Sequence, residues 1–120
     1  MADSATIPMH LDVPEIATFM SSNAVDDLRA ADPSGPVAVD EDGRSAQTFL
    51  VEVVVRSGGV ERRVVASGRD IYAVTAPLVV EAAFRILAGA GATAGVASVG
   101  ARFDAKDFLS SLSPQHLTLR

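Results

Sequence analysis

The stretch Gln47–Ser67, QTFLVEVVVRSGGVERRVVAS, decides the fold. Both of its arms are rich in β-branched residues, which favour extended backbone. Gly58 and Gly59 stand between the arms and suit a two-residue turn, whose residues need positive φ angles. The stretch therefore predicts an antiparallel hairpin. A turn at these glycines pairs Ser57 with Val60, Arg56 with Glu61, Val53 with Val64 and Val51 with Ala66.

This register gives the hairpin two different faces. One face is apolar apart from the cation Arg62 and carries Phe49, Val51, Val53, Val55 and Val64. The other face is half apolar and carries Glu52, Val54, Arg56, Glu61, Arg63 and Val65. Scattered surface valines are ordinary, but a half-apolar face also suits contact with a second subunit. We expect a homodimer on this basis.

Two helices are expected after the hairpin. The first runs from Thr75 or Ala76 to Ala88, with Thr75 as its cap, Pro77 in its first turn and Gly89 just past its end. Its apolar stripe is expected to cover the sheet and consists of Val79, Val80, Ala83, Phe84 and Leu87. The second helix starts at the cap Asp104 and ends at Pro114, and residues 115–120 either trail off or add an edge strand.

The part before the hairpin gives weaker signals. Residues 1–9 are expected to be frayed, and a short helix is expected from Asp12 to Met20, with Glu15 completing a capping box. Further elements are one or two helical turns at Val25–Ala31, a loop at Asp32–Pro36 and short strands at Val37–Val39 and Val96–Val99. The order of elements predicts one α+β domain over residues 1–120, an antiparallel sheet with a central β-hairpin covered by helices.

Composition excludes several classes of function. The net charge of −5 argues against nucleic acid as a partner, because phosphate binding needs a basic face. The longest apolar stretch, Ile71–Leu87, is broken by Pro77, Glu81 and Arg85, so no membrane span is expected. The chain has no cysteine, and its two histidines have no metal-ligand spacing, so no metal site is expected. A start without a basic and apolar leader favours a cytoplasmic protein.

Four segments carry a resemblance to a known family. They read RDIYAVTA (69–76), RILAG (85–89), GVA (95–97) and GARFDAKDFL (100–109). In this order they resemble the C-terminal, non-Rossmann domain of saccharopine-dehydrogenase-like oxidoreductases, over roughly residues 47–112. The resemblance implies a domain with the substrate-side sheet and often the dimer contact. In that family a separate Rossmann domain binds the dinucleotide.

A site for NAD(P) is not expected in this chain. Its one glycine-rich run, Gly89–Gly95, follows a predicted helix and precedes a predicted strand. Pyrophosphate binding requires the reverse order, a strand followed by a glycine-rich turn and a helix. We therefore expect no cofactor, and any nicotinamide must come from a separate Rossmann-domain chain.

The candidate site residues lie on the hairpin and the helix that follows it. Tyr72 and Arg62 are the catalytic candidates, and the substrate-binding candidates are Phe49, Val51, Val53, Val55, Arg69 and Phe84. Each polar candidate has a structural alternative: Tyr72 as a packed aromatic, Arg62 as a snorkelling edge residue, and Arg69 as a partner of Asp70 or Glu52.

Two functions follow as hypotheses. The first is a stand-alone small-molecule-binding domain, a cofactor-independent cyclase or isomerase of an apolar, polyketide-like substrate in secondary metabolism, where holding the reacting ends together lowers the barrier. The alternative is a substrate-binding or dimerisation subunit of a split reductase. A third origin, a domain excised from a longer reductase, stays open.

Overall fold

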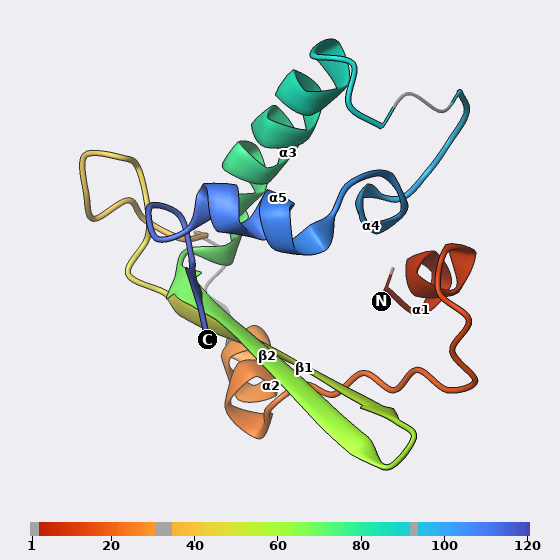
Figure 1. The fold of residues 1–120 in the computed structure, drawn as a ribbon. Coiled ribbons are helices and arrows are strands. Elements are labelled where there is room, and N and C mark those ends of the chain that lie inside the picture. The colour runs from red at the N-terminus through yellow and green to blue at the C-terminus, as the bar shows by residue number, and fades with distance from the viewer. Residues whose placement is uncertain (1–2, 31–34, 92–93) are drawn as a thin grey trace. The chain divides into compact units, whose positions relative to one another are not determined.

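The structure, a computed structural model, describes residues 3–30, 35–91 and 94–120 (Figure 1). Backbone contacts divide the chain into two units, which are described separately: Met1–Gly35 with Thr93–Phe103, and Pro36–Ala92 with Asp104–Arg120. A three-stranded antiparallel sheet accompanied by helices confirms the α+β class. The expectation of one domain over residues 1–120 stays a prediction.

The hairpin of the second unit has the predicted register. Its strands are β1 (Thr48–Ser57) and β2 (Val60–Arg69). Ser57 pairs with Val60, and the other expected pairs follow along the ladder. The turn glycines Gly58 and Gly59 have φ angles of 57° and 77°, a region that glycine enters without steric cost. The turn chemistry therefore sets the pairing of the whole hairpin.

The C-terminus adds an edge strand, which was one of the two alternatives for it. Strand β3 (Thr118–Leu119) pairs with Ala66 and Ser67, so β2 is the middle strand of the sheet. The ladder extends to Arg120, whose N–H donates to the Val65 carbonyl over 2.9 Å. The outer edge of β1 and residues 60–64 of β2 have no third strand among the described residues.

The long helix α3 (Ile71–Leu87) starts earlier than predicted. Its cap is Asp70, not Thr75, and Pro77 lies inside the helix rather than in its first turn. The carboxylate of Asp70 accepts the N–H groups of Tyr72 and Ala73, which a helix otherwise leaves without partners. Aspartate also tolerates the left-handed backbone found here, with φ of 53°. The exit at Gly89, with φ of 84°, is as predicted.

Asp70 also joins the helix to the loop that precedes the hairpin. Its buried carboxylate accepts the Ser45 N–H over 2.7 Å, and its own N–H donates to the Gln47 carbonyl over 2.8 Å. The hydrogen bond from Ser45, followed by that from Ala73, holds the pKa of Asp70 below its ordinary value. One side chain thus fixes the loop, the end of β2 and the start of α3.

Helix α5 (Ala105–Leu112) packs on α3 and is capped as predicted. The Asp104 carboxylate accepts the Asp107 N–H over 2.8 Å. The buried apolar side chains among the described residues come from α3, α5 and the segment before β3, and they are Val74, Phe108, Leu112 and Leu117. The core of this unit therefore lies beside the base of the hairpin, not along its length.

A polar network clamps α5 to α3. Arg85 forms ion pairs with Glu81, over 2.6 Å, and with Asp107, and its guanidinium lies 5.1 Å from the centre of the Phe108 ring. The Ser111 hydroxyl donates to Glu81 over 3.1 Å. The bonds from Arg85 and then Ser111 lower the pKa of Glu81, while Asp107 and then Glu81 raise that of Arg85.

The expectation that the apolar stripe of α3 covers the sheet was wrong. From Asp70, where β2 ends and α3 begins, the helix and the hairpin run in different directions (Figure 1). The stripe is consequently exposed, with 65 % of Phe84 and 84 % of Leu87 accessible. The helix instead buries Val74 near its start and contacts α5 through Glu81 and Arg85.

In the first unit, the predicted helix at Asp12–Met20 was wrong. That segment has no helix or strand, since Pro14 and the β-branched residues around it disfavour a short helix. Helix α2 (Ser22–Arg29) follows instead, and the Ser21 hydroxyl accepts the Ala24 N–H over 3.3 Å. The helical turns expected from Val25 thus start three residues earlier.

Three smaller expectations also need correction. Residues expected to fray form α1 (Asp3–Thr6) and a 3-10 turn, η1 (Ile7–Met9). The expected strand at Val96–Val99 is replaced by α4 (Val99–Arg102), because the Ser98 hydroxyl caps a helical turn. The expected strand at Val37–Val39 is reduced to one bridge, Ala38 with Ser45. Residues 31–34 and 92–93 of the predicted loops lie outside the described residues.

The longest helix of the described segments, α3, has 17 residues. No helix in those segments has both the length and the apolar character needed to cross a membrane.

The hydrogen bonds to the Asp70 carboxylate predict that the stability of the fold decreases in acid. A carboxyl with a lowered pKa stabilises the folded state above its unfolded pKa of about 4, and this contribution is lost as the pH falls through the folded pKa. Asp70→Asn keeps the left-handed backbone but places an amide against the Ser45 N–H. We expect its thermal midpoint at pH 7 to fall by roughly 5 °C or more, and to depend less on pH between about 5 and 3.

Circular dichroism melts at several pH values measure this change. Glu41→Gln is the matched control, because it makes the same carboxyl-to-amide change at an exposed position of the same unit. An Asp70→Asn protein with the melting profile of the control would contradict the role of Asp70.

Candidate functional site

The predicted substrate-binding valines lie together on one open face of the hairpin. Val51, Val53 and Val55 share this face with Arg62, which pairs with Val55 as expected. Together with Val60 and Val64, these valines are between 47 and 57 % exposed. We call Val51, Val53, Val55, Val60 and Val64 the valine face. It is an open surface rather than the wall of a described cavity.

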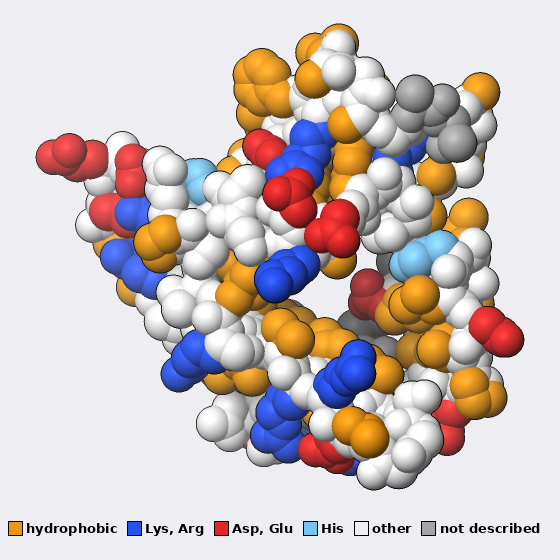
Figure 2. Space-filling model, in the orientation of Figure 1, with side chains coloured by type: hydrophobic (Ala, Val, Ile, Leu, Met, Phe, Trp, Pro, Cys, Tyr) orange, Lys and Arg blue, Asp and Glu red, His pale blue; other side chains and the backbone are white. Residues whose placement is uncertain are grey.

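The opposite face of the hairpin is closed by ion pairs. Arg63 lies 2.7 Å from Glu52 and 3.8 Å from Glu61, and Arg56 lies 2.9 Å from Glu61. Its valines, at positions 54 and 65, are partly buried. The expectation that a second subunit covers this half-apolar face stays a prediction. Hydrophobic side chains reach the surface over α3 and among the charged side chains of the hairpin (Figure 2).

Phe49 packs at the base of the hairpin. A β-carbon on its cross-strand partner Gly68 would lie 2.9 Å from the Phe49 ring and 3.3 Å from the His116 carbonyl. The glycine therefore lets the ring and the turn before β3 approach the strand together. Phe49 is half-buried and braces this junction, so its position indicates a structural role.

The remaining candidates lie at separate places. Arg69 pairs neither with Asp70 nor with Glu52: it lies 3.6 Å from Asp40 and donates to the Ser45 carbonyl over 3.3 Å. Tyr72 is 68 % exposed on the first turn of α3 rather than packed. The structure therefore gives Arg69 a structural partner and leaves Tyr72 at the surface.

The two catalytic candidates are far apart along the fold. Arg62 lies seven residues before Arg69 on β2, which corresponds to about 23 Å of strand. Tyr72 follows Arg69 by three residues, a reach of at most about 10 Å. Their Cα atoms are thus at least about 13 Å apart. The structure does not bring them together at one described cavity.

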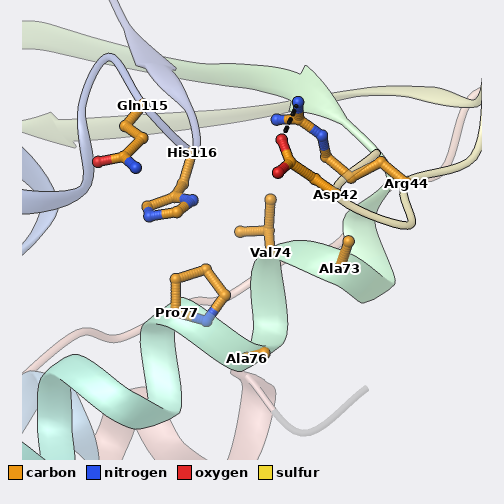
Figure 3. A pocket seen from close by; sticks show the side chains of 8 residues that line it. All are labelled: Asp42, Arg44, Ala73, Val74, Ala76, Pro77, Gln115 and His116. Atoms are coloured by element: carbon orange, nitrogen blue, oxygen red, sulfur yellow. Dashed lines mark hydrogen bonds and ion pairs between the residues drawn. The ribbon is translucent and has the colours of Figure 1, made fainter. Parts of the chain in front are cut away.

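The described pocket lies elsewhere in the second unit (Figure 3). It has a volume of about 290 Å³ and is partly open to solvent. None of the predicted site residues lines it. Its lining comes from the acidic turn, the first turns of α3 and the segment between α5 and β3, and consists of Asp42, Arg44, Ala73, Val74, Ala76, Pro77, Gln115 and His116.

One wall of the pocket is an arginine held by two carboxylates. The Arg44 Nε donates to Asp40 over 2.9 Å, and its Nη2 donates to Asp42 over 2.7 Å. Asp40 also accepts the Arg44 backbone N–H over 2.9 Å, and this bond, with the guanidinium, lowers the pKa of Asp40. The Asp42 side chain is 72 % exposed, whereas that of Asp40 is 22 % exposed. Asp40 therefore anchors the arginine, and Asp42 is its peripheral partner.

The facing wall carries two polar side chains, those of Gln115 and His116. Figure 3 shows the His116 imidazole reaching over Pro77, with Val74 between it and the Asp42–Arg44 pair. Within the described residues, neither this imidazole nor the Gln115 amide hydrogen-bonds to another side chain. The His116 N–H donates to the Leu112 carbonyl over 2.9 Å, which fixes the backbone that presents the ring.

The first unit brings His10 close to Ser98. Nδ1 of His10 lies 3.2 Å from the Ser98 hydroxyl and 3.1 Å from the Thr6 carbonyl. A carbonyl only accepts, so Nδ1 carries a proton and cannot remove one from Ser98. The same hydroxyl caps α4 by accepting the Ala101 N–H over 3.2 Å. The pair therefore joins two segments and is not an activated nucleophile.

Comparisons with known proteins give no relative. No family model, no curated protein and no solved structure matches the chain. The described residues also contain no group of three or more histidine, aspartate or glutamate side chains arranged to hold a metal ion. The resemblance to saccharopine-dehydrogenase-like oxidoreductases thus stays a hypothesis drawn from the motifs.

The sequence did not predict the pocket, because its lining comes from three segments that are distant in the chain. Arg44 stands four residues after Asp40, a spacing that signals a local ion pair but no cavity. His116 is predicted only as a tail residue, since its position depends on the pairing of β3.

The packing of Phe49 on Gly68 gives a stability prediction. Gly68→Ala puts a β-carbon against the ring and the His116 carbonyl, so we expect the free energy of unfolding to fall by about 1–3 kcal/mol. The further change Phe49→Leu removes the ring atoms at the clash. The double variant should therefore lose less stability than the sum of the single losses, by about 0.5 kcal/mol or more in urea unfolding. Strict additivity would show that the two residues do not collide.

Proposed function

We propose that the chain is an assembly subunit, in which two copies bury their valine faces against each other. The observation that carries this proposal is the exposure of the valine face, on a hairpin whose other face satisfies its own charges. An uncovered apolar face of this kind marks an interaction surface. The proposal keeps the homodimer expected from the sequence but places its interface on the opposite face of the hairpin.

The small core of the described residues supports a partner. Its buried apolar side chains are Val74, Phe108, Leu112 and Leu117. Such a core stabilises a unit weakly, so a covered valine face would add stability.

A second copy is a suitable occupant because the face is compatible with itself. Its one charged side chain is Arg62, two residues along β2 from Val64. Suppose that the two-fold axis lies between the two faces, runs across the strands and passes Val64 of both copies. Each Arg62 then lies two residues from the axis, on opposite sides, so the two arginines are about 13 Å apart along the strands. This exceeds the screening length of about 8 Å at physiological salt, so the repulsion is small.

The cyclase hypothesis has less support. It needs Tyr72 and Arg62 around one substrate, but the described pocket contains neither of them. The split-reductase hypothesis is compatible with the valine face if a separate Rossmann-domain chain, rather than a second copy, covers it.

A charge on the valine face tests the proposal. We expect the wild-type protein to sediment as a dimer at about 10–100 μM and Val53→Glu to sediment as a monomer, because a dimer would bury the new carboxylates. Leu50→Glu is the control, since Leu50 is also exposed on β1 but points to the opposite face. Analytical ultracentrifugation, with circular dichroism to verify folding, measures the outcome.

Two results would overturn the proposal. One is a wild-type protein that is monomeric throughout this range, which would favour a different chain as the occupant. The other is equal dissociation by Leu50→Glu and Val53→Glu, which would place the contact elsewhere.

A further inference from the structure

We infer that the pocket beside α3 binds a small carboxylic acid with an apolar body, and that Asp42 occupies the position of the ligand's carboxylate when the pocket is empty. The pocket is separate from the valine face: none of its lining residues belongs to β1 or β2. The inference therefore does not depend on the proposed dimer.

The floor of the pocket suits an apolar body. It consists of the small or branched side chains of α3, which are Ala73, Val74, Ala76 and Pro77. Val74 is buried, so this surface is held in place by the core of the unit. The volume of about 290 Å³ lies just below the range of about 300–1,000 Å³ that is usual for small-molecule sites. A single ring or a short branched chain matches this space better than a large metabolite.

The arginine wall suits a carboxylate. Asp40 binds the Nε of Arg44, while the Nη2 donates to Asp42, and both Arg44 and Asp42 line the pocket (Figure 3). A guanidinium pairs naturally with a carboxylate, and Asp42 already places one at 2.7 Å from Nη2. A ligand carboxylate would take over the ion pair that Arg44 now forms with Asp42.

Displacing Asp42 requires little free energy. Its side chain is mostly exposed, and exposed ion pairs contribute little because water and salt screen them. Arg44 would keep its anchor on Asp40 during the exchange, so the guanidinium need not reorganise. The facing wall adds donors from Gln115 and His116, which have no hydrogen-bonding side-chain partner among the described residues.

The probe is phenylacetate, and 2-phenylethanol is its uncharged counterpart with the same body. Titration of the 15N-labelled full chain should give saturable amide shifts at Arg44, Ala73 and His116 with the acid, and much weaker ones with the alcohol. Arg44→Lys, which keeps the charge but loses the paired donors, should weaken binding of the acid several-fold and leave the alcohol unchanged.

Asp42→Asn tests whether the ligand displaces the Asp42 carboxylate from Arg44 or responds only to the net charge near the pocket. Removing the internal competitor should tighten phenylacetate binding by about two- to five-fold, the range expected for loss of an exposed ion pair. Glu41→Gln removes the same charge from the adjacent residue, which forms no described ion pair with Arg44. It should therefore change the affinity less than Asp42→Asn does.

Several outcomes would overturn the inference. They are the absence of saturable shifts with the acid, equal binding of the alcohol, shifts that map away from the pocket, or an equal gain in affinity from Glu41→Gln. Repeating the titration with Val53→Glu keeps the two proposals distinct, because this variant should be a monomer that still binds phenylacetate. A wild-type protein that is monomeric but binds phenylacetate would refute the dimer and retain the site.

Discussion

The carboxylate of Asp70 is the contact on which the second unit depends. It accepts three backbone N–H groups, from Ser45, Tyr72 and Ala73, at the point where a strand becomes a helix. Its left-handed backbone turns the chain sharply between β2 and α3. Since the direction of α3 follows from this turn, the same residue decides that the helix leaves the sheet rather than lying along it.

The exposed surfaces follow from that geometry. Because α3 packs on α5 instead of on the hairpin, the core gathers around Val74 and Phe108, and the valine face is left open. The Arg85 network then holds the two helices by charge and hydrogen bonds as well as by apolar contact. A fold of this kind leaves the valine face exposed while the charges between α3 and α5 are paired.

The pocket arises at the same joint. The Asp70–Ser45 bond brings the acidic turn close to the start of α3, and pairing of β3 with β2 brings His116 to the other side. Each of these contacts has a structural purpose of its own, but together they leave a cavity with an arginine at its wall. A pocket can thus result from the way that loops are attached to a helix.

Much of the local structure was predictable from the residues. The glycine turn gave the hairpin register, Asp104 gave the start of α5 and Gly89 gave the end of α3, because each depends on neighbours in the sequence. The first-unit errors also have local causes: the pattern at Asp12–Pro14 resembles a helix start, but the residues that follow do not support a helix. Asp70 was overlooked as a cap because Pro77 gave a competing signal for a later start.

The sequence by itself determined the α+β class, the two faces of the hairpin and the absence of a strand–glycine–helix motif for a dinucleotide. Only the tertiary structure decided which hairpin face is open, and which of the candidate residues meet. The physical reason is that strand register and helix caps depend on residues close in the chain. The direction of α3 and the position of His116 depend instead on contacts between distant segments, and no periodicity in the sequence encodes them.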